Sequence, residues 1–176
     1  MTDHPVRRIL GVDPGSRAAG YAVLEAHGSR VRAIDYGVIR VPADLPLAQR
    51  LSRLYAQLVK IVERHEPSEM AIEEVFAAHN VRSALVLGQA RGVLLLAAAD
   101  RCAVYEYSAR TVKKAVVGYG QADKHQVAQM VKMLLGLPKT PAHDAADALA
   151  IALCHLHSSR MNRQIDAAAR AVGARR

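Results

Sequence analysis

The chain has 176 residues, 51% of them hydrophobic, and a formal net charge of +8, so it is long enough for one domain with a sizeable core. It has no apolar run long enough to span a membrane, no apolar signal segment at its start and no zinc-ligand spacing around Cys102 and Cys154. These features predict a cytoplasmic protein with reduced thiols and no membrane partner. The positive charge favours a polyanionic partner, most simply nucleic acid, although a merely soluble basic surface has the same composition.

The first part of the chain predicts an antiparallel meander. Residues 9–12 form a short apolar run that ends in a turn at Pro14-Gly15. Residues 20–25 and 31–41 alternate between apolar and polar side chains, which indicates two further strands. Three strands joined by short links pair most simply as antiparallel neighbours.

The middle of the chain predicts parallel pairing. A helical apolar pattern runs from Leu47 to Val62, a strand follows at 70–75, and a fifth strand is expected at 103–107. A strand, a crossover helix and another strand form a parallel unit. We therefore expect an α/β fold with a five-stranded mixed sheet, in which an antiparallel meander adjoins parallel strands and helices flank the sheet.

The helix expected at 82–100 is apolar around its whole circumference. Such a helix is normally buried on all sides. Either its own domain covers it, or a second subunit covers part of it, and Gly88 and Gly92 would permit a close approach.

The last part of the chain predicts three helices and a tail. A brief helix contains Lys113 and Lys114, and a second covers 123–135. Thr140 and Pro141 suit the N-cap and first position of a last helix that ends near Ser159. We expect one domain over residues 1–160 and a flexible or loosely helical basic tail over 161–176.

Four carboxylates stand out against this outline. Asp13 ends the first strand, Glu73 ends the fourth, and Asp144 and Asp147 share one face of an otherwise apolar helix. Each has an ordinary explanation: a turn residue, a partner of an arginine, or acids near a helix N-terminus. Together at one sheet edge they would suit two Mg²⁺ or Mn²⁺ ions, which can activate water and stabilise the leaving oxygen of a phosphodiester.

The motifs together resemble the RuvC family of Holliday-junction resolvases, over roughly residues 8 to 157. The segments that carry the resemblance are Ile-Leu-Gly-Val-Asp13-Pro-Gly-Ser-Arg, Ala-Ile-Glu73-Glu-Val-Phe76, Leu-Gly-Gln89-Ala-Arg91-Gly and Asp144-Ala-Ala-Asp147-Ala-Leu-Ala. The resemblance implies a ribonuclease-H-like fold, a homodimer, and Mg²⁺-dependent endonuclease action that resolves four-way DNA junctions by two symmetric nicks. It also implies roles in recombination and repair and cooperation with the branch-migration complex RuvAB.

The resemblance assigns roles to individual residues. The family's four metal-binding acids match Asp13, Glu73, Asp144 and Asp147, its functional lysines match Lys113 and Lys124, and its junction-opening aromatic residue matches Phe76. Lys124 would lie against the scissile or a neighbouring phosphate, whereas Lys113, Lys114 and Arg82 are weaker candidates for contacts with the DNA backbone. Some relatives use a histidine as a ligand in the last helix, but we keep Asp144 and expect His143 to face solvent.

Two other functions remain to be weighed. An ATPase of the actin and sugar-kinase type also opens with a glycine-rich aspartate turn on a meander, but it needs two such domains. A related ribonuclease-H-like nuclease or a junction-binding module could act on another nucleic-acid structure. The presence of all four acids favours a nuclease over a binding module.

Overall fold

The computed structural model describes residues 5–74 and 80–173, and side chains as far as Ser159. One sheet with strand order β3-β2-β1-β4-β5 organises the molecule. β1 pairs antiparallel with β2 and parallel with β4, while β3 and β5 complete the two edges. The mixed sheet predicted from the sequence is thus confirmed. Its strands are β1 (Arg7–Asp13), β2 (Ala18–His27), β3 (Arg30–Arg40), β4 (Glu69–Glu73) and β5 (Ala103–Tyr107).

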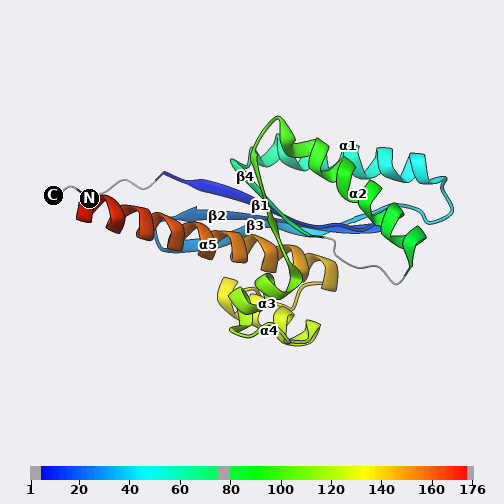
Figure 1. Ribbon diagram of the computed structural model, residues 1–176. Helices are drawn as coiled ribbons and strands as arrows, with labels where there is room; N and C mark the ends of the chain where they lie inside the picture. The colour runs from blue at the N-terminus through cyan, green and yellow to red at the C-terminus, as the bar shows by residue number, and fades with distance from the viewer. Residues whose placement is uncertain (1–4, 75–79, 174–176) are drawn as a thin grey trace.

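Helices cover both faces of the sheet (Figure 1). The helices on one face are α1 (Leu47–His65) and α2 (Val81–Ala99). Those on the other face are α3 (Ala109–Val117), α4 (Lys124–Leu135) and α5 (His143–Gly173). Of the second group, α5 lies directly along the strands, and α3 and α4 pack against α5 farther from the sheet (Figure 1).

The alternation of side chains along the strands divides the core into two layers. Leu10 and Val12 of β1 pack with α1 and α2, whereas Ile9 packs with α5. In β4, Ile72 belongs to the first layer and Ala71 to the second. Because side chains alternate between faces, Asp13 and Glu73 must point to the same side as Ile9 and Ala71, which is the side of α5.

Two glycines let α5 lie unusually close to the sheet. A Cβ atom on Gly20 would be 1.9 Å from the carbonyl oxygen of Asp144, and one on Gly11 would be 2.2 Å from that of Ala148. Both distances are far inside van der Waals contact, so no other residue fits at these positions without moving the helix. The side of α5 that faces these glycines is rich in buried alanine, and such small side chains keep the helix close to the sheet.

The start of α5 differs from the sequence prediction. The helix begins at His143, and its first main-chain hydrogen bond is donated by Ala146 to the carbonyl of Ala142. The predicted N-cap at Thr140 is therefore wrong. Its hydroxyl instead accepts a hydrogen bond at 3.4 Å from the side chain of Gln129, which holds it against α4.

The end of α5 also differs. The helix was expected to end near Ser159, but it continues to Gly173 and is 31 residues long. The segment after Ser159 contains neither proline nor glycine before Gly173, and its alanine and arginine residues favour the helical state.

We predict that Gly20→Ala lowers the free energy of unfolding by about 3 kcal/mol or more, because the added methyl group would overlap the main chain of α5. Urea denaturation measures the change. Gly120→Ala is a matched control, since its Cβ would meet only the flexible side chain of Arg110 at 2.7 Å, and it should change stability by less than about 1 kcal/mol. Equal denaturation midpoints for Gly20→Ala and the wild-type protein would show that stability does not depend on the close contact between Gly20 and α5.

Candidate active site

A cavity opens where β1 and β4 end beneath α5. Its volume is about 210 Å³, and three carboxylates face it: Asp13 from β1, Glu73 from β4 and Asp147 from α5. Lys113 of α3 and Lys124 of α4 line the same cavity. The remaining lining is apolar and consists of Ala109, Val112, Val127 and Ile151. Acidic and basic side chains from five elements thus converge on one partly apolar cavity.

Burial and mutual repulsion make Asp13 a weak acid. Burial is the largest cause and the nearby charges of Asp147 and Glu73 add to it, so that the pKa of Asp13 rises from 3.8 to about 8. The side chains of Asp13 and Glu73 lie close enough for a hydrogen bond, which would require that one of them carries a proton. Burial likewise raises the pKa of Glu73, although Lys124 and Lys113 oppose the rise.

Asp147 and Lys124, which both line the cavity, form an ion pair. The Nζ atom of Lys124 lies 3.5 Å from Oδ2 of Asp147. Burial raises the pKa of Asp147 while this lysine and, more weakly, His143 oppose the rise. The charge of Asp147 in turn raises the pKa of Lys124, which therefore stays an ammonium group at neutral pH.

Asp144 and His143 lie at the margin of this group. Asp144 does not line the cavity, but its negative charge contributes to the raised pKa values of Asp13 and Asp147. His143 is exposed at the first position of α5, as expected from the sequence.

The donor set fits hard divalent cations. Oxygen ligands that repel one another across a partly apolar cavity gain most from a small ion of high charge, and such binding displaces the shared proton. Among the residues that the structure describes, however, no three histidine, cysteine, aspartate or glutamate side chains are already arranged as ligands of one ion. The carboxylates are gathered but not yet in coordination geometry. Asp13 is engaged with Glu73, and Asp147 with Lys124.

The other residues expected at the site lie in different places. Lys113 lines the cavity, but Lys114 is exposed in the last turn of α3, and Arg82 is exposed at the start of α2. Phe76 lies outside the described residues. Sequence reasoning ranked Lys113 below Lys124, although both face Glu73 closely enough to lower its pKa. The match of Lys113 to a functional lysine of the family was the signal that the sequence offered.

Comparison with known proteins gives one consistent family. Residues 9–155 match the family model described as crossover junction endodeoxyribonuclease RuvC. Curated proteins of that name from Marinobacter nauticus and Magnetococcus marinus are 52% and 49% identical to the chain. The first alignment covers 94% of this chain and 93% of the relative, and the second covers 89% and 88%.

The structural comparison agrees. The T. thermophilus RuvC in complex with Holliday junction substrate superposes with a TM-score of 0.83 at 35% identity, covering 90% of this chain and 97% of the other. The yeast mitochondrial Holliday junction resolvase Ydc2 matches with a TM-score of 0.61 at 18% identity, over 86% of this chain and 79% of the other. The second match shows a shared fold only.

We predict that Asp13→Asn stabilises the protein at pH 8 in EDTA, by about 2 kcal/mol or more. Asp13 has a higher pKa in the folded protein, about 8, than its ordinary value of 3.8 in the unfolded chain. Between these two pH values the unfolded chain loses the proton more readily, so the stability of the wild-type protein falls as the pH rises. The advantage of the variant should therefore shrink as the pH falls from 8 toward 4. Urea denaturation across this range tests it.

The control for this prediction is Asp44→Asn, an exposed aspartate in the loop before α1 that loses the same charge. It should leave the pH dependence of the wild-type protein unchanged. A constant difference between Asp13→Asn and the wild-type protein at every pH would contradict the raised pKa. Addition of Mg²⁺ should stabilise the wild-type protein more than Asp13→Asn.

Proposed function

The chain belongs to the RuvC family of crossover junction endodeoxyribonucleases, and we propose that it resolves four-way DNA junctions by paired symmetric nicks in recombination and repair. The observation that carries the proposal is the convergence of three acids, Asp13, Glu73 and Asp147, and two lysines, Lys113 and Lys124, on one cavity. Acids that can hold cations and bases that can hold phosphate are the two components that phosphodiester hydrolysis requires.

We propose Asp13, Glu73, Asp144 and Asp147 as the residues that hold two Mg²⁺ ions per subunit, with Mn²⁺ as a substitute. When bound, such ions supply an activated water and stabilisation of the departing 3′ oxygen. Lys124, whose side chain is 70% exposed, can leave Asp147 and donate to the scissile or a neighbouring phosphate. The apolar part of the lining lowers the local polarity, which strengthens electrostatic contacts made against it.

DNA binding is proposed to extend beyond the cavity. Lys113 lies inside it, and the exposed Lys114 and Arg82 would contact the phosphate backbone farther out. The net charge of +8 supports such contacts, which add affinity and salt dependence but no sequence preference. Phe76 remains our candidate for a wedge that stacks on a base at the branch point, on the strength of its match to the family.

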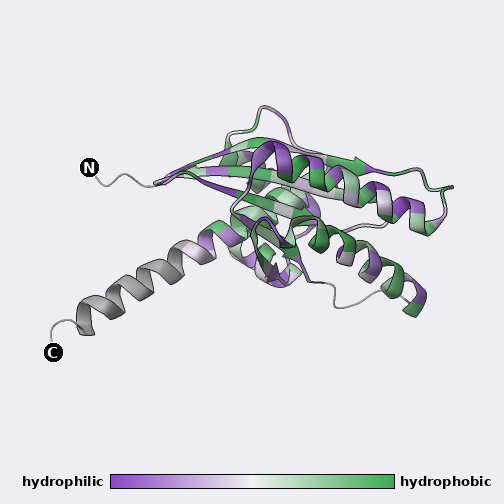
Figure 2. Ribbon diagram, turned by 90° about the horizontal axis from the view of Figure 1, so that it is seen from above, coloured by the Kyte–Doolittle hydropathy of each residue, from purple (hydrophilic) through white to green (hydrophobic). Residues whose placement is uncertain are grey.

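We propose a homodimer assembled through α2. Its buried residues Ala90 and Leu94 pack into the protomer, while Leu85 and Leu96 on the opposite side are 64% and 61% exposed. Figure 2 shows α2 as mainly apolar, in contrast to the alternating surface of α1. The protomer therefore covers only one side of this helix. Of the two alternatives left by the sequence, complete coverage by its own domain is excluded. A Cβ atom on Gly88 or Gly92 would meet nothing within 4 Å, so a partner backbone could approach there.

The length and composition of α2 would also allow it to cross a membrane, and 22% of it is buried in the protomer. Its packing against α1 and the guanidinium of Arg91, which bonds to β4 and β5, identify it as a helix of this fold. The partner we propose is a second copy of the chain, because it carries the same apolar surface and because a twofold dimer would match the near-twofold symmetry of an opened junction. We also propose that the protein acts together with the branch-migration complex RuvAB and that it is located in the cytoplasm.

We predict that Asp13→Asn, Glu73→Gln, Asp144→Asn and Asp147→Asn each abolish junction cleavage and leave junction binding intact. The acids hold the ions, whereas the basic surface holds the phosphates. Cleavage of a mobile synthetic four-way junction in Mg²⁺, read at nucleotide resolution beside duplex and RNA–DNA hybrid substrates, measures the effect. Near wild-type cutting by one variant would remove that residue from the ligand set. Preference for the hybrid or for duplex would favour a different ribonuclease-H-like nuclease.

We predict that the protein sediments at about twice 19.0 kDa at micromolar concentration, and that Leu85→Glu and Leu96→Glu convert it to a folded monomer. Both side chains are exposed in the protomer, so a charge there would disturb association rather than folding. Met133→Glu on α4, where the side chain is 72% exposed, is the control and should remain dimeric. A wild-type monomer that still produced paired nicks would contradict both the interface and the symmetry argument.

A further inference from the structure

Arg91 of α2 makes two contacts that the proposed cleavage does not account for. Its Nε atom donates a hydrogen bond at 3.0 Å to the main-chain carbonyl of Glu73, and its Nη2 atom pairs with the carboxylate of Glu106 in β5. The Arg91 side chain is 17% exposed. Two of its nitrogen atoms thus donate within the protein, one of them to the main-chain carbonyl of a residue whose carboxylate faces the cavity.

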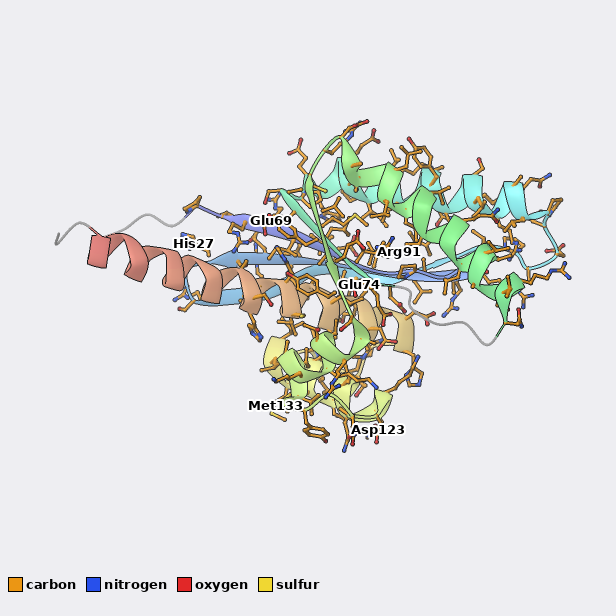
Figure 3. All side chains as sticks on the ribbon, in the orientation of Figure 1. His27, Glu69, Glu74, Arg91, Asp123 and Met133 are labelled. Carbon is orange, nitrogen blue, oxygen red and sulfur yellow. The ribbon has the colours of Figure 1, made fainter. Side chains whose placement is uncertain are left out.

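The Glu73 peptide is held from both sides at the end of β4. The N–H of Glu74 donates to the carbonyl of Tyr107 at 2.9 Å, which joins this peptide to β5. The Glu73 carbonyl, at the same peptide bond, receives Arg91. Figure 3 shows Arg91 and Glu74 near this end of β4, between α2 and the sheet. Without Arg91, one of the two restraints on this peptide is lost.

We propose that Arg91 is a positioning residue that fixes the Glu73 carboxylate by holding the carbonyl of the same residue, and so sets the efficiency of metal binding and cleavage. The inference rests on the proposed function of the site. Glu73 is partly buried and is the last residue of β4, so the hydrogen bonds to the peptide at this strand end help to set where its carboxylate lies. An error of about 1 Å in a ligand position can cost about 10²-fold in rate.

The chemistry of arginine suits this role. Its planar guanidinium presents several donors in a fixed geometry, so that one group can hold the Glu73 carbonyl while Glu106 fixes its orientation. A lysine keeps the charge but has a single nitrogen at its end, and it cannot reproduce both contacts with the same geometry. Arg91→Lys therefore tests position separately from charge.

The experiment compares Arg91→Lys, Glu106→Gln and the control Arg101→Lys. Arg101 follows the C-terminal end of α2 and also pairs with a glutamate of another element, Glu63 of α1. Within the described part of the chain it makes no hydrogen bond or ion pair with Asp13, Glu73 or Asp147. Three quantities are measured for the full-length protein: the single-turnover cleavage rate of a synthetic four-way junction in Mg²⁺, the junction affinity in EDTA, and the Mn²⁺ concentration that gives half of the thermal stabilisation without DNA.

Arg91→Lys should cleave about 10-fold or more slowly and need several-fold more Mn²⁺, with junction affinity within about twofold of wild type. Glu106→Gln should show a smaller loss of the same kind, because the side chain of Glu106 is half-exposed and the pair is screened. Arg101→Lys should match the wild-type protein. A residue that served only stability would lower the melting temperature in EDTA and leave the Mn²⁺ requirement unchanged.

Cleavage and Mn²⁺ requirement of Arg91→Lys within twofold of wild type would overturn the inference, as would a loss of cleavage matched by an equal loss of junction binding. If Arg91→Lys does not fold, Glu106→Gln decides the question by the same criteria. The Mn²⁺ measurement needs no DNA. A wild-type protein that cut no junction would therefore refute the proposed function and still leave the positioning role of Arg91 testable.

Discussion

The close contact between α5 and the sheet determines where every acidic side chain of the site lies. Because Gly20 and Gly11 have no side chains, the main chain of α5 at Asp144 and Ala148 reaches the strands directly. Asp147 is thereby brought over the ends of β1 and β4, where strand alternation has already turned Asp13 and Glu73 toward the helix. Any residue larger than glycine at these two positions would lift the helix and separate its carboxylate from those of the sheet.

This arrangement has an electrostatic cost that the protein does not remove by itself. Three carboxylates share a partly apolar cavity, and the pKa of Asp13 reaches about 8 chiefly because it is buried. A proton shared by Asp13 and Glu73 would offset part of the repulsion, and the ammonium of Lys124 offsets another part. Both are replaceable, since a divalent cation displaces the proton and a phosphate attracts the lysine. The unfavourable metal-free site is therefore the property that would give cations and substrate their affinity.

Strand alternation and motif spacing were sufficient to predict the sheet, its mixed order and the gathering of Asp13, Glu73 and Asp147, because these features follow from local periodicity. The start of α5 was predicted wrongly at Thr140, whose hydroxyl instead accepts a hydrogen bond from Gln129 of α4, a tertiary contact that no local pattern reveals. Arg91 was visible only as part of a family motif. Its contact with a main-chain carbonyl depends on how α2 lies against β4, and a carbonyl leaves no residue-type signal in the sequence.

Helix α2 connects the two halves of the proposed mechanism physically. One side carries the exposed apolar surface that we propose for the second subunit, and Arg91, directed into the protomer, holds the strand end that bears Glu73. A helix is stiff along its axis, so a displacement of α2 at the interface would move the guanidinium and the Glu73 peptide with it. In a symmetric dimer both sites would be restrained by the same interface. Two symmetric nicks, one by each subunit, require two sites that are competent together. An interface shared in this way supplies that requirement without a separate signalling element.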